Sequence, residues 1–174
     1  MVRMGIRALL SLSSVKLSVS IHEAGTTEEA INKSTANCYD VILMDYHLPG
    51  GGGPKATKLI LNKRPETCVL ALSNYDEISY VKRMMGAGAR GYILKNIEPD
   101  TLVTAIRTVL RGTLFYSNEI ALKLLELAGI RAARNRLTTR EKVIFRLIIQ
   151  RMIDREIKAS WVLQSGRWTN TGKN

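Results

Sequence analysis

Three polar residues follow apolar segments of the sequence and could do chemistry together: Asp45, Ser73 and Lys95. Each has an ordinary explanation by itself, since an aspartate or a serine at such a place often caps the next helix and a lysine there is usually solvated. Together they offer a carboxylate nucleophile, a hydroxyl and an ammonium group. Such a set suits the transfer of an anionic group to the carboxylate, with the lysine offsetting the added charge.

The elements that must position these three residues alternate along the chain. Residues 41–44 form an unbroken apolar run, which is typical of a strand covered on both faces in a parallel sheet. The apolar patterns predict strands at residues 17–22, 39–45, 68–73 and 91–94. They predict helices at residues 26–36, 54–62, 76–85, 98–110 and 118–127, after a first helix near residues 2–10. This alternation predicts a doubly wound parallel sheet, in which the carboxyl ends of the strands share one edge.

Two glycine-rich stretches need separate interpretation. The loop after Asp45 contains Pro49 and the run 50–53, and its backbone can lie close to the sheet edge. It lacks the lysine of a phosphate-cradling loop, because Pro54 stands in that place. Residues 86–91 spell GxGxxG. A helix is expected before this motif and a strand after it, the reverse of a dinucleotide-binding unit, so we reject that function.

The segments DVILMDYHLPGGGG, VLALSNYDE and GARGYILKN resemble the receiver domain of two-component response regulators. The resemblance covers residues 1–112 and implies that Asp45 takes a phosphoryl group from a histidine kinase or a small phosphodonor. It implies that Ser73 and Lys95 bind this group and that Tyr92 is the switch aromatic. Magnesium would be held by Asp45 and the backbone carbonyl of His47, whose imidazole is expected to be solvated and without a role.

The beginning of the chain departs from the family pattern. Receivers begin with a strand that ends in an acidic pair for magnesium and continue into the helix that reads GIRALLSLS here. We therefore expect a flavodoxin-like sheet without its first strand, no acidic pair, and weak phosphorylation. In the family's strand order 2-1-3-4-5, the missing strand would lie between residues 17–22 and 39–45.

The C-terminal part resembles a LuxR-type helix-turn-helix. Residues 113–136 are expected to form a linker containing one helix, and residues 137–174 an incomplete all-α segment that begins with a capping box at Thr138 and Glu141. Gly166 falls inside the expected recognition helix, so DNA binding should be weak, salt-sensitive and indifferent to sequence. The basic side chains expected to contact DNA are Arg155, Lys158, Arg167 and Lys173.

Composition supports a globular protein with a polyanionic partner. Of the formal net charge of +11, residues 113–174 supply +7, which favours nucleic acid as that partner. No apolar run approaches the ~20 residues that span a bilayer, so we expect no membrane association and a cytoplasmic location. Cys38 and Cys68 adjoin or lie in expected buried strands and belong to no metal-binding motif, so both are interpreted as reduced core thiols.

These observations predict a response regulator of a two-component phosphorelay, with a receiver phosphorylated on Asp45 that controls DNA binding and transcription. The alternative is a degenerate receiver that acts only as a protein-interaction module. We do not expect an enzyme, because no second acid/base pair accompanies Asp45. A homodimer is compatible with this interpretation.

Overall fold

The computed structural model describes Ala8 and residues 19–127 of the chain. The chain divides into two compact units, Met1–Ala121 and Leu122–Asn174, and each is considered by itself. The first unit contains a four-stranded sheet in the order β1-β2-β3-β4, in which every neighbouring pair is parallel. The strands are β1 (Val41–Asp45), β2 (Cys68–Ser73), β3 (Gly91–Leu94) and β4 (Phe115–Tyr116).

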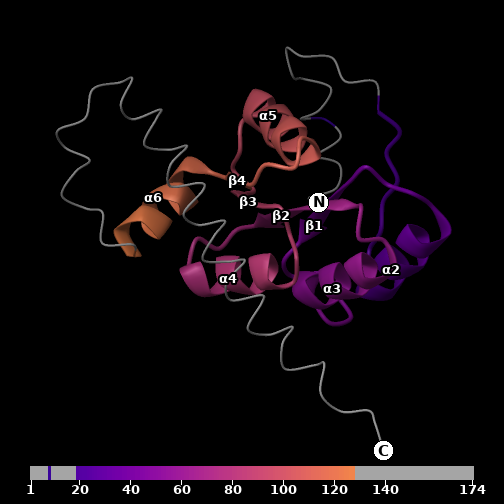
Figure 1. The fold of residues 1–174 in the computed structure, drawn as a ribbon. Coiled ribbons are helices and arrows are strands. Elements are labelled where there is room, and N and C mark those ends of the chain that lie inside the picture. The colour runs from indigo at the N-terminus through magenta and orange to yellow at the C-terminus, as the bar shows by residue number, and fades with distance from the viewer. Residues whose placement is uncertain (1–7, 9–18, 128–174) are drawn as a thin grey trace, which may run out of the picture. The chain divides into compact units, whose positions relative to one another are not determined.

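Helices cover both faces of this sheet. Figure 1 shows α5 on one face and α3 and α4 on the other, while α2 packs against α3. This layering confirms the predicted doubly wound architecture. The helices are α2 (Thr27–Ala36), α3 (Gly53–Lys63), α4 (Ile78–Gly86), α5 (Pro99–Leu110) and α6 (Asn118–Leu127).

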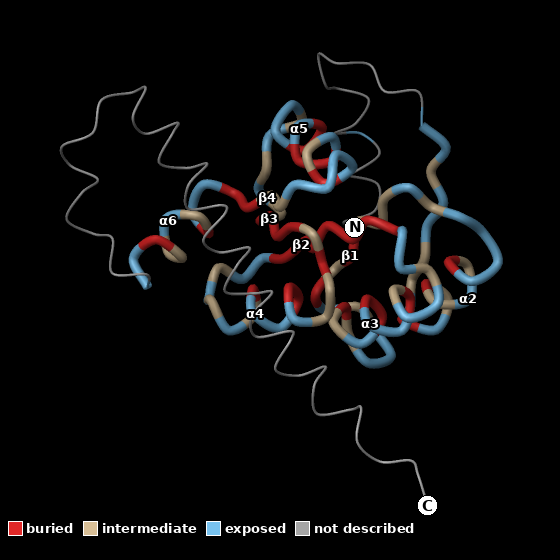
Figure 2. Tube along the Cα trace, in the orientation of Figure 1, coloured by how far each residue is buried: buried red, intermediate tan, exposed pale blue. Residues whose placement is uncertain are grey.

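The core follows from the unbroken apolar strands. Every residue of β2 and β3 is buried, and Figure 2 shows the buried positions concentrated along the strands and on the helix sides that face them. One cluster joins Leu70, Leu72 and Ile93 of the sheet to Leu102 and Val109 of α5. Full burial of a single aliphatic side chain of this size contributes about 1.5–3 kcal/mol, so the cluster fixes the strand ends firmly.

Thr26 and Glu29 stand at capping-box spacing in the sequence, and the start of α2 confirms that they cap this helix. Thr26 is the N-cap residue, and its hydroxyl accepts a hydrogen bond of 3.1 Å from the backbone N–H of Glu29. The Glu29 carboxylate in turn accepts a hydrogen bond from the N–H of Gly25. The first interaction satisfies a backbone donor that the helix itself leaves free, and the second fixes the chain that enters the helix.

The strand predicted at residues 17–22 is wrong for the part of it that is described, because residues 19–22 belong to no strand. An alternating sequence forms a strand only beside a hydrogen-bonded neighbour. Among the described residues β1 has one such neighbour, β2. The segment is held near β1 by side chains instead: the His22 Nδ1 and Tyr39 hydroxyl atoms lie 2.9 Å apart.

The sequence analysis did not predict β4, whose two residues are too few to show a pattern. It lies within the stretch 113–136, for which a linker and one helix were expected; that helix, α6, is confirmed. Gly91 allows β4 to approach β3 closely. A Cβ atom at this position would lie 2.7 Å from the Phe115 carbonyl oxygen and 2.6 Å from Leu70 Cδ1.

The two cysteines differ in environment. Cys68 is a buried free thiol, as expected, but Cys38 is exposed, so its assignment to the core was wrong. Cys38 precedes β1 and therefore lies outside the strand that would have covered it. No helix within the described part of the chain is long and apolar enough to cross a membrane.

Candidate functional site

The sheet brings the ends of three strands together at one edge. Asp45 is the last residue of β1 and pairs in register with Leu72, which precedes Ser73. Ser73 ends β2 and pairs with Leu94, which precedes Lys95. The backbone N–H of Lys95 donates a hydrogen bond of 2.9 Å to the Ser73 carbonyl oxygen. The three predicted residues therefore lie on adjacent strand ends.

The Asp45 carboxylate is held on both oxygen atoms. Lys95 Nζ lies 2.7 Å from Oδ2, and the His47 backbone N–H donates a hydrogen bond of 3.1 Å to Oδ1. The Asp45 side chain is 31% exposed and that of Lys95 16%. The carboxylate is thus oriented by the protein and still reachable from solvent, as a nucleophile must be.

The Ser73 hydroxyl takes part in a second, partly buried chain of hydrogen bonds. It accepts a hydrogen bond of 3.0 Å from the Tyr75 N–H, and the Tyr75 carbonyl oxygen accepts one of 2.8 Å from the Tyr92 hydroxyl. Ser73 and Tyr92 are both buried. Burial raises the pKa of Tyr92 to about 12, while the neighbouring Ser73 side chain acts in the opposite direction.

The His47 ring is exposed, as expected, but it belongs to an aromatic cluster that the sequence analysis missed. The cluster consists of Tyr46, His47, Tyr75 and Tyr80, where Tyr75 and Tyr80 stack at 4.8 Å between ring centroids. His47 meets Tyr75 edge to face at 5.0 Å. Only the topology could have predicted this cluster, because it joins the loops after β1 and β2 to α4.

The magnesium prediction does not fit the donors in the described residues. Asp45 is the one carboxylate of the predicted ligand set, and both of its oxygens already accept hydrogen bonds. No group of three or more His, Cys, Asp or Glu residues in this part of the chain could hold a metal ion. Magnesium prefers several oxygen ligands in octahedral geometry, so one carboxylate and a carbonyl are a poor site.

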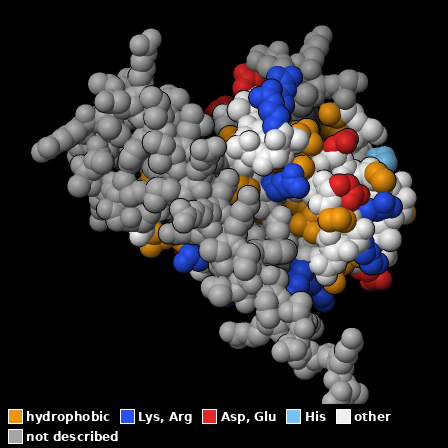
Figure 3. All heavy atoms as spheres, viewed as in Figure 1, with side chains coloured by type: hydrophobic (Ala, Val, Ile, Leu, Met, Phe, Trp, Pro, Cys, Tyr) orange, Lys and Arg blue, Asp and Glu red, His pale blue; other side chains and the backbone are white. Residues whose placement is uncertain are grey.

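The predicted DNA-contacting residues Arg155, Lys158, Arg167 and Lys173 lie outside the described residues, as does the capping box at Thr138 and Glu141. Figure 3 shows Lys and Arg side chains spread over the visible face of the described part, interspersed with acidic and hydrophobic ones. The structural evidence for function therefore comes from the sheet edge.

The fold and the strand-end residues agree with the family resemblance. Residues 1–107 match the family model described as response regulator receiver domain, and the chain belongs to this family.

The chain is similar to response regulator UvrY of Escherichia coli (strain K12), with 34% identity over 122 residues that cover 70% of this chain and 55% of UvrY. It is 34% identical to response regulator GacA of Pseudomonas viridiflava over 125 residues, which cover 71% of this chain and 57% of GacA. The chain thus spans a little over half the length of these curated relatives.

Solved structures show the same similarity. A two-component response regulator of the LuxR family from Aurantimonas sp. SI85-9A1 superposes with a TM-score of 0.67 at 30% identity, covering 73% of this chain and 89% of that one. The receiver domain of the putative response regulator NarL from Mycobacterium tuberculosis gives a TM-score of 0.58 at 30% identity, covering 64% and 88% of the two chains.

Proposed function

We propose that this chain is a response regulator whose receiver accepts a phosphoryl group on Asp45 and thereby controls DNA binding and transcription. The observation that carries this proposal is the pairing of the solvent-reachable Asp45 carboxylate with Lys95 at 2.7 Å, at the carboxyl edge of a parallel sheet. The phosphodonor would be a histidine kinase or a small acyl phosphate.

The transfer follows from the geometry of this pair. A carboxylate oxygen of Asp45 attacks phosphorus, the bond between phosphorus and the donor atom breaks, and the donor leaves with the electron pair. The product carries more negative charge than the carboxylate did, and the Lys95 ammonium group offsets part of it. Asp45 acts as an acceptor in this step, so we do not assign the chain an enzymatic turnover of its own.

Ser73 and Tyr92 can couple phosphorylation of Asp45 to a conformational change elsewhere in the fold. The Ser73 hydroxyl now bonds to the Tyr75 N–H. When it turns toward a phosphoryl group, this bond is lost and the Tyr75 peptide is free to move. The carbonyl oxygen of the same residue accepts the hydrogen bond of the Tyr92 hydroxyl, so a movement of Tyr75 also alters the hydrogen bond of the buried Tyr92 ring. This two-state element is the switch that the proposal requires.

The role of magnesium in the transfer depends on the ligands available at the phosphorylation site. Receiver domains typically bind Mg²⁺ in the phosphorylation site, but the described residues supply one carboxylate for it. We therefore assign no step of the transfer to the metal. The same shortage of ligands favours the second candidate function, a degenerate receiver that acts through protein contacts alone.

The proposal predicts that a phosphodonor alters DNA affinity through Asp45. Binding of the full chain to several unrelated duplexes should be weak and should fall steeply between roughly 50 and 200 mM salt, because phosphate neutralisation dominates it. Treatment with acetyl phosphate should change the affinity severalfold in the wild type and in Asp40→Asn, whose carboxylate is exposed. Asp45→Asn should not respond. Fluorescence anisotropy measures each affinity.

Three results would contradict parts of this account. An equal response in Asp45→Asn would remove Asp45 from the signalling path, and no response in any variant would favour the interaction-module function. Preference for one duplex by ~100-fold, or about 2.7 kcal/mol, would show that the recognition helix forms despite Gly166.

A further inference from the structure

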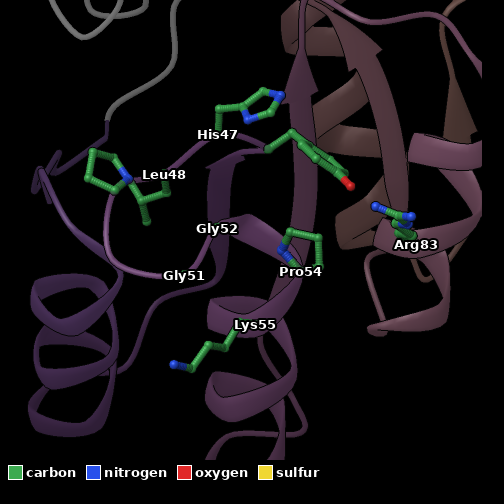
Figure 4. A pocket seen from close by; sticks show the side chains of 9 residues that line it. His47, Leu48, Gly51, Gly52, Pro54, Lys55 and Arg83 are labelled. Carbon is green, nitrogen blue, oxygen red and sulfur yellow. The ribbon is translucent and has the colours of Figure 1, made fainter.

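A hollow of about 660 Å³ opens beside the phosphoacceptor edge. Its wall is made by the loop that follows β1, by the first residues of α3 and by Arg83 of α4. Figure 4 shows Pro54 with a basic side chain on each side of it, Lys55 from α3 and Arg83 from α4. The volume lies in the range of small-molecule sites, which is about 300–1,000 Å³.

The hollow is positively charged and has no internal counter-charge. Its lining includes Lys55 and Arg83 but no aspartate or glutamate. No hydrogen bond or ion pair joins either basic side chain to another described residue. An anion in the hollow gains Coulomb attraction from both side chains.

The glycine loop makes room for the lysine. Gly51 has φ of +133°, and a Cβ atom built there would lie 2.7 Å from Lys55 Cδ. The absence of a side chain at position 51 therefore lets the aliphatic stem of Lys55 lie along the loop. A larger residue would displace this stem and move the ammonium group.

We propose that this hollow binds a small molecule carrying a polyvalent phosphate group. The Arg83 guanidinium can engage phosphate oxygens through two parallel hydrogen bonds, and Lys55 adds a compact point charge from the neighbouring helix. The exposed His47 ring and the Tyr46 ring at the rim provide apolar contact for the rest of the ligand.

The hollow is distinct from the phosphoacceptor site. Asp45 and Lys95 do not line it, and they are engaged with each other at 2.7 Å. The two sites share a loop, however, because Tyr46 and His47 follow Asp45 directly and the His47 N–H bonds to the Asp45 carboxylate. A ligand in the hollow restrains this loop and so tunes the reactivity of Asp45. The inference goes beyond the proposed function and does not depend on phosphorylation.

The test is a titration of the full chain with sodium pyrophosphate, in EDTA and at constant ionic strength, followed by the amide NMR signals of Gly51 and Gly52. These local signals separate binding in the hollow from binding to basic residues elsewhere. We expect the amide signals to shift and to reach saturation. The affinity for pyrophosphate should fall about tenfold in Lys55→Gln and in Arg83→Gln, which is the effect of losing one hydrogen bond to a charged group.

Matched controls are Lys58→Gln and Lys82→Gln, which remove exposed lysines of the same two helices that do not line the hollow. Both should bind as the wild type does. Equal weakening in the two lysine controls would overturn the proposal, as would unchanged affinity in Lys55→Gln and Arg83→Gln. Loss of the shifts in Lys95→Gln alone would place the anion at the phosphoacceptor edge instead.

Discussion

Replacement of Lys95 by glutamine should slow phosphoryl transfer to Asp45 by ~100-fold, which is the usual cost of removing one preorganised electrostatic partner from a reacting centre. In the structure the ammonium group lies 2.7 Å from Asp45 Oδ2, where the extra charge of an acyl phosphate develops. Glutamine keeps a hydrogen-bond donor of similar reach but removes the charge. The initial rate of labelling by radioactive acetyl phosphate measures the effect.

The fold should survive this substitution. The pair is partly solvated, with 16% of the Lys95 side chain and 31% of the Asp45 side chain exposed, and glutamine still offers the Asp45 carboxylate a hydrogen-bond donor. Lys63→Gln, at the end of α3, is a control with the same charge change outside the site. A labelling rate in Lys95→Gln that equals the rate in Lys63→Gln would show that the ion pair does not assist transfer.

The second large effect is expected for Gly53→Ala, at the first residue of α3. A Cβ atom there would lie 2.3 Å from the Asp45 carbonyl oxygen and 3.1 Å from Tyr46 Cα. Both neighbours are backbone atoms, so α3 must move away from β1 to relieve the clash. We expect a loss of about 1–3 kcal/mol in the free energy of unfolding, together with slower labelling because Asp45 moves as well. Urea denaturation measures the first quantity.

Gly86→Ala is the matched control for this substitution. Gly86 is the last residue of α4, and a Cβ atom there would meet nothing within 4 Å. Alanine favours the helix over glycine by up to about 1 kcal/mol, so this variant should be neutral or slightly more stable. Equal free energies of unfolding in Gly53→Ala and Gly86→Ala would contradict the close packing of Gly53 against the backbone at the end of β1.

The sequence was sufficient to predict the strands that carry the site. The unbroken apolar runs that end at Asp45 and Ser73 identify β1 and β2, since strands buried on both faces lack alternation. The parallel arrangement then requires Asp45, Ser73 and Lys95 to share an edge, as the structure confirms. Local rules also predicted the α2 N-cap and the bounds of α6.

Features that depend on tertiary contact were not predictable in this way. The alternating pattern at residues 17–22 indicated a strand, but a strand also requires a neighbour, and the described residues provide none on that side of β1. The strand β4 is two residues long and depends on the small volume of Gly91. The contact of His47 with Tyr75 and the hollow lined by Lys55 and Arg83 combine residues from separate elements, whose meeting no local pattern shows.

Intact-mass measurement after incubation with acetyl phosphate and magnesium tests the central claim, that Asp45 is the phosphoacceptor. The account predicts that the wild type gains a single phosphoryl group in part of the molecules, and that Asp45→Asn gains none while Asp40→Asn matches the wild type. Partial labelling is expected because the described residues offer one metal-binding carboxylate at the site. Full labelling that persists in Asp45→Asn would contradict the assignment.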